Sequence, residues 1–223
     1  MYVVFLKRLI DVVVSFSVIL LLLPLYAVLA LVVYFDLGAP VIFKQKRPGK
    51  DNKIFTIYKF RTMLPECDKD GKKLSHSERI TKTGRFLRRT YLDEIPEFFC
   101  VLCGTMTLIG PRPQLIEDMV FYSDEIMVRQ SVTPGLTGLA QSKGKDGLGW
   151  DNKFKYDIQY TQNITFINDV KIIGNTLKMI FSKSAMPFDS SVDEGNYGDM
   201  LLREGRISKE DYDKALKYAK AFY

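Results

Sequence analysis

"VVVSFSVILLLLPLYAVLALVVYF", residues 12–35, contains no charged side chain along its whole length. A membrane helix needs about 20 predominantly apolar residues in a row, so this segment is long enough to enter a bilayer. A secretory signal peptide fits less well, because the apolar part is too long and no small-x-small cleavage pattern precedes Asp36. The sequence therefore predicts a membrane helix near the N-terminus, and the rest of the fold has to be arranged around it.

Pro24 lies at the centre of this segment and interrupts helical hydrogen bonding. Each half, taken as a helix, covers about 18 Å, whereas the hydrocarbon core of a bilayer is about 30 Å thick. Basic residues, which favour the cytoplasmic side, flank both ends of the segment: Lys7 and Arg8 before it, and Lys44, Lys46, Arg47, Lys50 and Lys53 after it. We therefore expect a re-entrant membrane helix broken at Pro24, and the alternative is a kinked helix that crosses the membrane once.

The charge of the chain points to anionic partners. Its 223 residues include 32 Lys and Arg against 26 Asp and Glu, which gives a formal net charge of +6 and a pI near 9.1. Such an excess favours nucleic acid, anionic lipid or phosphorylated small molecules, and charge alone does not choose among them. The cysteines, Cys67, Cys100 and Cys103, form no disulfide framework, so we expect a reducing environment; a zinc site completed by His76 is the weaker alternative.

The remaining pattern predicts an α+β fold that is mostly helical. Two β-type runs, Val41–Lys44 and Ile54–Lys59, flank the turn sequence RPGKDN and predict a small β-hairpin. The polar region from Glu66 to Gly84 is expected to be a loop. We divide the chain into a re-entrant membrane helix at 1–36, a catalytic domain at the cytoplasmic face at 37–186, and a linker with a C-terminal helical appendage at 187–223.

Two interfacial amphipathic helices are expected between Asp151 and Ser182, with a break around Asn163. Their apolar side chains either lie on the membrane interface or pack against the core: Tyr156, Tyr160, Ile172, Leu177 and Ile180. The stretch SAMPFDSSVDEGNYG, residues 184–198, is interpreted as a linker. A final helix follows Ser208, where Asp211 completes a capping-box pattern, and its apolar stripe packs on this chain or on a second copy in a homodimer.

"RRTYLDEIPEFF", residues 88–99, places two adjacent carboxylates next to two arginines. The structural interpretation is that Asp93 caps a helix whose first turn contains Glu94 and Pro96. The functional interpretation is a phosphate site, because a helix start offers free N–H groups, and Arg88 and Arg89 would hold phosphate and lower a carboxylate pKa. Adjacent helical residues point about 100° apart, so the two carboxylates are expected to take different roles.

Two rigid loops follow the acidic pair. In GTMTLIGPRPQ, residues 104–114, Pro111 and Pro113 fix the backbone on both sides of Arg112, whose planar guanidinium suits bidentate contact with phosphate. A structural turn with a surface arginine is the alternative. In TPGLTGLAQSKGKDG, residues 133–147, glycines permit a close backbone approach, and Lys143 and Lys145 add charge.

Several motifs in the same order resemble the bacterial sugar transferase family, the monotopic phosphoglycosyl transferases, in its small stand-alone form. The resemblance covers Phe5 to Phe181, and its segments are KRLID, VIFKQKRPGKDNKIFTIYKFRTM, LDEIPEF, GTMTLIGPRP and PGLTGLAQ. It implies transfer of a sugar-1-phosphate from a UDP-sugar to undecaprenyl phosphate, with release of UMP, as the first step of a membrane-linked glycan such as capsule, O-antigen, exopolysaccharide or glycoprotein. It also implies a location at the cytoplasmic face of the bacterial inner membrane.

The resemblance also implies roles for individual residues. Asp93 would be the nucleophile that attacks the β-phosphorus and forms an aspartyl-phosphosugar intermediate, and Glu94 would be the ligand of an essential Mg²⁺. The other implied substrate-binding residues are Lys59, Arg88 and Arg112 at the phosphates, Pro111 and Pro113 at the nucleotide pocket, and Gln141 and Lys145. Lys145 stands where the family has an arginine, a change that keeps the charge and loses the planar fork.

Two other functions would use the same features. A membrane-anchored anion-binding protein explains the net charge and the membrane helix, but two carboxylates amid the cations would weaken binding to nucleic acid, so we expect no nucleic-acid partner. A lipid-phosphate hydrolase would form its product without any UDP-sugar. The resemblance favours the transferase, with a UDP-sugar, undecaprenyl phosphate and membrane lipid as partners, and it leans towards N-acetylated amino sugars by analogy.

Overall fold

The computed structural model describes residues 2–67, 70–144, 148–181 and 195–223, and helices dominate this part of the chain. The predicted α+β fold, mostly helical with a small hairpin, is confirmed. The helices are α1 (Lys7–Leu37), α2 (His76–Arg79), α3 (Lys82–Arg89), α4 (Glu97–Cys103), α5 (Ile116–Met119), α6 (Asp124–Met127), α7 (Leu139–Lys143), α8 (Gly149–Gln162), α9 (Phe166–Phe181), α10 (Tyr197–Arg203) and α11 (Lys209–Ala219). The strands are β1 (Ile42–Pro48), β2 (Ile54–Phe60), β3 (Thr107–Ile109) and β4 (Gly135–Thr137).

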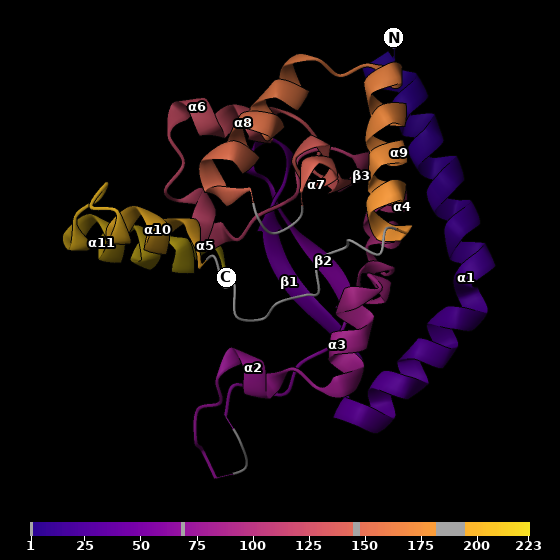
Figure 1. Cartoon of the computed structure of the whole chain (residues 1–223), viewed down its shortest axis with the longest axis horizontal. Helices are drawn as coiled ribbons and strands as arrows, with labels where there is room; N and C mark the ends of the chain where they lie inside the picture. The colour runs from indigo at the N-terminus through magenta and orange to yellow at the C-terminus, as the bar shows by residue number, and fades with distance from the viewer. Residues whose placement is uncertain (1, 68–69, 145–147, 182–194) are drawn as a thin grey trace.

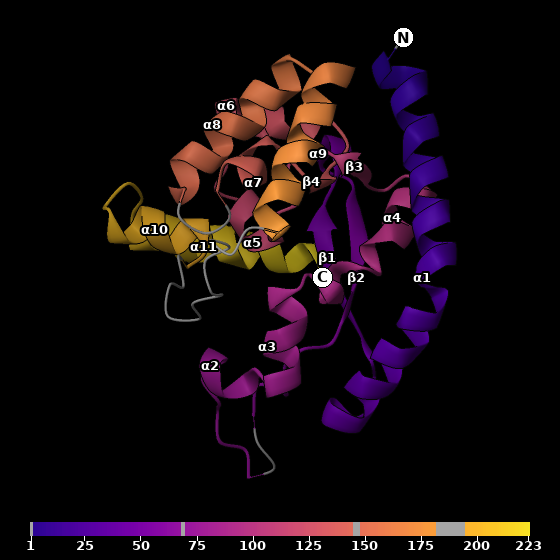
Figure 2. The same ribbon diagram turned by 45° about the vertical axis from the view of Figure 1, so that its right-hand side comes forward.

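The N-terminal helix α1 runs without interruption for 31 residues and contains Pro24. It bends near its middle, as Figures 1 and 2 show, which is expected where proline removes a hydrogen bond and its ring clashes with the preceding turn. By length and composition α1 can cross a membrane, and large apolar side chains such as Leu20, Leu21 and Leu23 are exposed along it. The expected long apolar helix near the N-terminus is confirmed, but the expected break at Pro24 is a bend within a continuous helix.

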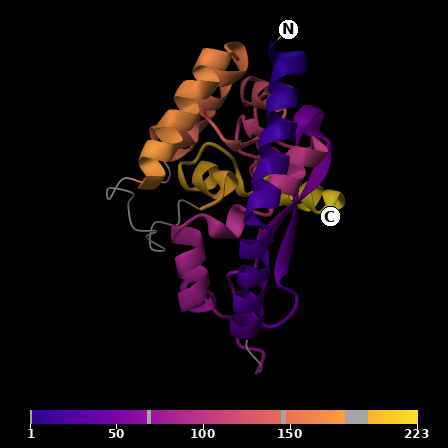
Figure 3. The same ribbon diagram turned by 90° about the vertical axis from the view of Figure 1, so that its right-hand side faces the viewer.

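The first half of α1 forms hydrogen bonds with α4, α9 and β3. Lys7 Nζ donates to Asp169 Oδ2 of α9 at 2.5 Å, and Arg8 Nη2 donates to the carbonyl oxygen of Leu102 in α4 at 2.7 Å. The Asp11 carboxylate accepts from the backbone N–H of Leu108 in β3 at 2.9 Å. Polar side chains inside an apolar helix therefore point at the folded domain, and Figure 3 shows α1 running along the whole length of that domain.

The second half of α1 packs against the same domain. Leu29 and Val33 are buried in one cluster with Phe60 of β2 and Leu87 of α3. Just past the end of α1, the carbonyl oxygen of Gly38 accepts a hydrogen bond of 2.6 Å from the guanidinium of the residue that follows β2, Arg61. Both ends of the long helix are thus bonded to one folded unit.

The hairpin predicted between Val41 and Lys59 is confirmed and slightly longer than expected. β1 and β2 are antiparallel, with Ile42 opposite Phe60 and Pro48 opposite Ile54. Figures 1 and 2 place this hairpin between α1 and the C-terminal helices. The second sheet, in which β3 and β4 run parallel, was not predicted, because three-residue strands leave no clear alternation in the sequence.

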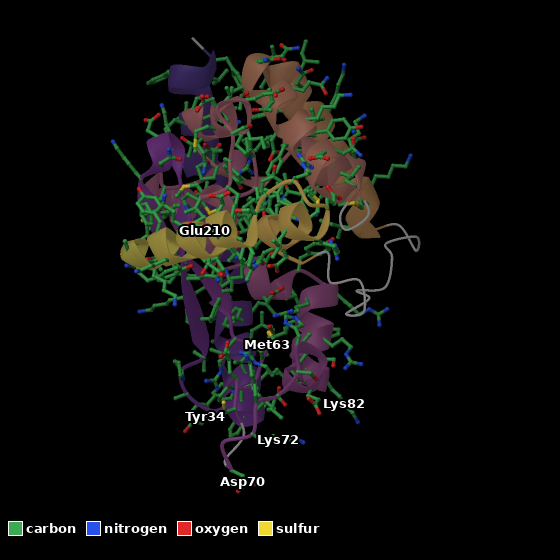
Figure 4. All side chains as sticks on the ribbon, turned by 90° about the vertical axis from the view of Figure 1, so that its left-hand side faces the viewer. Tyr34, Met63, Asp70, Lys72, Lys82 and Glu210 are labelled. Carbon is green, nitrogen blue, oxygen red and sulfur yellow. The ribbon has the colours of Figure 1, made fainter. Side chains whose placement is uncertain are left out.

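The segment from Glu66 to Gly84 contains more structure than the predicted loop. Helix α2 begins after Ser75, whose hydroxyl accepts from the backbone N–H of Glu78, while the Glu78 carboxylate accepts from the backbone N–H of Ser75 at 2.8 Å. This S-x-x-E capping box was present in the sequence and would have predicted the helix. Figure 4 shows Asp70 and Lys72 at the far tip of this segment.

The two expected amphipathic helices are α8 and α9, separated by residues 163–165. Tyr160 and Ile172 pack in the core with Ile109, so for these two side chains the core interpretation holds. The exposed large apolar side chains of α9 are Phe166, Ile167, Val170, Ile173, Leu177 and Ile180. The start of α9 lies close to the start of α1, where Asp169 pairs with Lys7.

The linker expected at residues 184–198 extends too far towards the C-terminus, because residues 197 and 198 are helical. Residues 182–194 lie outside the described part of the chain. Helix α10 begins at Tyr197, which is only 3% exposed in a cluster with Trp150 and Phe154 of α8. The local sequence predicts a linker here. It does not reveal the burial of Tyr197, because Trp150 and Phe154 are distant in the sequence. The apolar stripe of α11 packs on this chain, since Ala219 is buried against Ile116 of α5.

Candidate active site

The acidic pair lies in a short 3-10 turn, Leu92–Glu94, between α3 and α4. Tyr91, just before the turn, has a left-handed conformation with φ of 58°, which turns the chain after α3. Asp93 does not cap α4, as the structural interpretation proposed, because that helix begins at Glu97 and its N-cap residue is Pro96. The backbone N–H of Glu94 donates to the carbonyl oxygen of Tyr91 at 3.2 Å, so the turn and not a helix start positions the pair.

Glu94 is surrounded by two cations. Its Oε1 accepts from Lys59 Nζ of β2 at 2.7 Å, and both of its oxygens accept from the guanidinium of Arg112. Lys59 also pairs with Glu97 of α4 at 3.2 Å. Burial opposes ionisation of Glu94, but the charges of Arg112 and Lys59 outweigh it and hold the pKa of Glu94 well below its usual range.

Asp93 has a different environment although it is the next residue. Its side chain is buried, with 8% of the residue exposed, and among the described residues it forms no close ion pair of the kind that Glu94 makes. Burial and then the negative charge of Glu94 raise the pKa of Asp93, and the charges of Lys59 and Arg88 act in the opposite direction. The pKa of Asp93 is therefore raised from its ordinary value, whereas the pKa of Glu94 is lowered.

Arg88 is positioned by the close approach of α3 to the hairpin. Its Nε donates to Thr62 Oγ1 at 2.9 Å. Gly84 makes this approach feasible, because a Cβ atom there would lie 2.0 Å from the backbone oxygen of Thr62. Burial lowers the pKa of Arg88, and the nearby charge of Asp93 opposes that effect.

A buried ion pair supports the turn that carries Arg112. Arg129 donates from Nη2 to the carbonyl oxygen of Arg112 at 2.6 Å and pairs with Asp157 of α8 at 2.7 Å. Arg129 and Asp157 are each only 1% exposed. On the preceding residue, the carbonyl oxygen of Pro111 accepts from the backbone N–H of Gly135 at 2.9 Å. Hydrogen bonds at Pro111 and Arg112 thus hold the turn, in agreement with the rigid turn that Pro111 and Pro113 predicted.

Two cavities meet at the acidic pair, and Tyr91, Glu94 and Arg112 line both. We call the first the cationic cavity; its volume is about 610 Å³ and its charged lining residues are Arg47, Lys59, Arg61, Arg79, Arg88, Asp93, Glu94 and Arg112. We call the second the helix cavity; its volume is about 590 Å³, and α1, α7, α8 and α9 contribute to a mainly apolar wall. Asp93 faces only the cationic cavity.

The structure brings most of the predicted site residues together. Lys59, Arg88, Asp93, Glu94 and Arg112 line the cationic cavity, and Gln141 of α7 lines the helix cavity. Pro111 and Pro113 are buried beside Arg112, and Lys145 lies outside the described residues. The sequence analysis missed Thr62, Glu97, Arg129 and Asp157; no local pattern pairs them, since each finds its partner at least 26 residues away or on another element.

The site could supply one carboxylate ligand, that of Glu94, to a hard divalent cation. Within the described ranges, no group of three His, Cys, Asp or Glu residues is arranged to hold a metal ion. Mg²⁺ is commonly bound by one or two carboxylates together with water and substrate phosphates, so Glu94 fits as a carboxylate ligand that a phosphorylated substrate completes. Both Glu94 oxygens accept hydrogen bonds from cations in this structure, so a metal ion at Glu94 would share this carboxylate with Arg112 and Lys59 or displace one of them.

The sequence is similar to known sugar transferases. The family model "Bacterial sugar transferase" matches residues 2–183. "Uncharacterized sugar transferase EpsL" of Bacillus subtilis is 43% identical over 149 residues, which are 67% of this chain and 74% of that protein. "Undecaprenyl-phosphate galactose phosphotransferase" of Salmonella typhimurium is 36% identical, covering 80% of this chain and 41% of that protein. "UDP-glucose:undecaprenyl-phosphate glucose-1-phosphate transferase" of Escherichia coli is 38% identical, covering 77% of this chain and 39% of that protein, so this chain spans about two-fifths of the last two relatives.

Proposed function

Because this chain belongs to the bacterial sugar transferase family, we propose that it transfers a sugar-1-phosphate from a UDP-sugar to undecaprenyl phosphate and releases UMP. The observation that carries the proposal is the position of Asp93, a buried carboxylate that faces the cationic cavity beside Lys59, Arg88 and Arg112. Cations so arranged suit the phosphates of a nucleotide sugar. The helix cavity on the other side of Glu94 has the apolar wall that a polyprenyl chain needs.

The proposed reaction has two displacements at one phosphorus. An oxygen of the Asp93 carboxylate attacks the β-phosphorus, the bond from that phosphorus to the oxygen bridging it to the α-phosphorus breaks, and UMP leaves with the electron pair. A phosphate oxygen of undecaprenyl phosphate then attacks the aspartyl-phosphosugar, and the bond between phosphorus and the Asp93 oxygen breaks. The carboxylate is regenerated, and a diphosphate-linked lipid sugar is formed. Arg88 and Arg112 bind and orient the phosphates during both steps.

We assign Glu94 to Mg²⁺ in this scheme, completed by oxygen atoms of the substrate. Bound Mg²⁺ would neutralise the charge that develops on the leaving phosphate. Glu94 suits this task because Arg112 and Lys59 keep it ionised. Asp93 suits the nucleophilic task because it faces the cationic cavity, where the charges of Lys59 and Arg88 favour its ionised form against the effect of burial.

We further propose that α1 is re-entrant and that the site lies at the cytoplasmic face of the bacterial inner membrane. Both ends of α1 are bonded to the same folded domain, through Lys7 and Arg8 at one end and Gly38 at the other. A helix held in this way has both ends on one side of the bilayer unless the domain itself crosses. Single cysteines placed at residues 5 and 38 of a cysteine-free variant should both be labelled by an impermeant reagent only after spheroplasts are opened; labelling of one end in sealed spheroplasts would refute this topology.

The proposed activity is tested with purified protein, undecaprenyl phosphate, Mg²⁺ and a panel of UDP-sugars, with UMP release as the readout. The wild type should release UMP only when the lipid is present, and Asp93→Asn should abolish turnover while still binding the nucleotide. Asp124→Asn, which changes an exposed carboxylate on α6, is the matched control and should leave turnover unchanged. Product formed from the lipid without any UDP-sugar would indicate a hydrolase, and binding without any turnover would indicate an anion-binding protein.

A further inference from the structure

One face of α3 carries three cations and an exposed phenylalanine. Its residues follow the i, i+3, i+4, i+7 spacing that places side chains on one side of a helix, and all of them are exposed. Phe86 is 58% exposed, whereas its neighbour Leu87 is buried. We call this set the outer face of α3: Lys82, Arg85, Phe86 and Arg89.

Neither the fold nor the proposed chemistry accounts for these cations. Arg88 lines the cationic cavity, but the three cations of the outer face line neither that cavity nor the helix cavity, so Arg89 is not placed with Arg88 at the phosphate site. Among the described residues, none of the three forms a salt bridge or a side-chain hydrogen bond. Lys82 is the first residue of α3, where a cation opposes the helix dipole, so it does not serve to stabilise the helix.

Helix α3 begins where the apolar part of α1 ends. Asp36 is the first charged residue after the apolar run 12–35, so it marks the level at which α1 would leave the hydrocarbon layer of a bilayer. Thr81, the residue before α3, donates from Oγ1 to Asp36 Oδ2 at 2.6 Å, and Leu87 packs with Leu29 of α1. Figures 1 and 2 show α3 beside this end of α1. Helix α3 thus lies at the boundary of that layer whether α1 returns or crosses.

The composition of the outer face suits that boundary. Lysine and arginine near a bilayer surface are attracted to anionic headgroups, and aromatic side chains are favoured at the level of the headgroups. Phe86 lies on the same helical face as Arg85 and Arg89, so an apolar ring and two cations are presented to the same side. This combination is typical of helices that lie on a membrane surface.

We propose that the outer face of α3 docks on the anionic phospholipid headgroups of the membrane that α1 enters. Charge complementarity selects this occupant, and Phe86 enters the headgroup layer among the cations. A second copy of this chain suits the face poorly, because a two-fold contact would set the cations against one another. This inference rests on the proposed membrane location and is independent of the transfer reaction. The contact also bears on the site, since the same helix carries Arg88 to the cationic cavity.

The test measures how freely water reaches residue 86. The protein carries a nitroxide label at Phe86→Cys in a cysteine-free variant and is placed in nanodiscs that hold one copy each. One set of discs contains phosphatidylcholine alone, the other contains phosphatidylglycerol as well, and neither contains undecaprenyl phosphate. Electron paramagnetic resonance measures collisions of the label with an uncharged nickel complex that stays in water. Each Lys or Arg near an anionic surface strengthens binding about fivefold, so phosphatidylglycerol should reduce these collisions by at least about fivefold.

Two charge-removing variants decide whether the cations are the cause. The first combines Lys82→Gln, Arg85→Gln and Arg89→Gln, and its label should be equally accessible in both kinds of disc. The matched control removes three exposed lysines from the α11 region, which Figure 1 places across the molecule from α1, and it should keep the wild-type protection. Its substitutions are Lys214→Gln, Lys217→Gln and Lys220→Gln. Equal accessibility in both kinds of disc with the outer face intact, or protection that survives in the folded first variant, would overturn the proposal.

A salt series on the intact cations decides the question if the first variant fails to fold. Raising the ionic strength from about 0.1 M to about 1 M shortens the Debye length from about 10 Å to about 3 Å, so the label should regain its access to water. Protection that does not change with salt would overturn the proposal. So would protection by a soluble oligonucleotide in neutral discs with none from phosphatidylglycerol, which would assign the face to nucleic acid. No outcome depends on turnover, so a failure of the proposed transferase activity leaves this test intact.

Discussion

Asp93 and Glu94 are adjacent in the chain, yet burial raises the pKa of Asp93 while Arg112 and Lys59 lower the pKa of Glu94. The cause is geometric, because the 3-10 turn directs one side chain into a salt-bridged position and leaves the other facing the cationic cavity. Two carboxyl groups that titrate apart are suited to different tasks in one reaction.

Arg88→Gln is expected to move the acid side of the pH profile to higher pH. Arg88 favours the ionised form of Asp93, so its loss raises the pKa of Asp93 further, and the active carboxylate is lost earlier as the pH falls. The measurement is kcat for UMP release against pH, from the acid limb to neutrality. Arg88→Lys keeps the charge and should stay closer to the wild type; identical acid limbs in all three proteins would contradict this role.

Gly84→Ala is expected to reduce both stability and turnover. The added Cβ meets the Thr62 backbone at 2.0 Å, so α3 must move and Arg88 loses its position, at a cost of about 1–3 kcal/mol. Gly174→Ala on the exposed face of α9 is the matched control; nothing lies within 4 Å of its Cβ, and alanine favours a helix by about 0.5–1 kcal/mol. Thermal unfolding and UMP release should separate the two variants, and equal melting temperatures would refute the close approach of α3.

Tyr197→Ala is expected to destabilise the protein more than it slows the chemistry. Tyr197 fills an aromatic cluster with Trp150 and Phe154, far from Asp93 in the sequence, and truncating a buried aromatic side chain costs roughly 3–5 kcal/mol. Tyr218→Ala on α11, where the residue is 62% exposed, should change stability by no more than about 0.5 kcal/mol. Deletion of residues 190–223 is likewise expected to alter assembly or stability more than chemistry.

Turnover per folded molecule, measured after thermal unfolding has given the folded fraction, distinguishes a loss of stability from a slower reaction. A Tyr197→Ala protein that is fully folded but turns over far more slowly would show that the appendage serves the reaction itself.

Acidification from neutrality is expected to stabilise the folded protein through the buried residue Asp118. Burial raises the pKa of Asp118 from 3.8 to about 6, so the folded state binds this proton more tightly than the unfolded chain does. The stabilising contribution is complete below about pH 4 and is lost as the pH rises through about 6, with an upper limit of roughly 3 kcal/mol.

The measurement is the melting temperature between pH 4 and 7 for wild type, Asp118→Asn and Asp124→Asn. Asp118→Asn should show a flatter dependence than the wild type because it cannot take up the proton. Asp124→Asn, exposed on α6, should keep the wild-type dependence. A slope in Asp118→Asn equal to that of the wild type would refute the assignment.

Local patterns predicted the elements whose signal lies within one segment. The long apolar run gave α1, the alternation around RPGKDN gave the hairpin, and Ser208 with Asp211 gave the start of α11. The short parallel pair β3 and β4 and the helix α10 were missed, because their burial depends on partners distant in the sequence. Asp93 was wrongly offered as a helix cap because a left-handed Tyr91 delays the start of α4, which residue order does not reveal.

The sequence by itself determined the long apolar N-terminal helix, the excess of basic charge, and the acidic pair with its arginines, since hydrophobicity, charge and proline act locally. Only the tertiary structure decided that Lys59 and Arg112 pair with Glu94 rather than Asp93, and that Arg129 and Asp157 hold the turn of Arg112. The physical reason is that Coulomb and desolvation energies depend on distance and burial in space. Those quantities exist only once β2, the 3-10 turn and α8 have packed together.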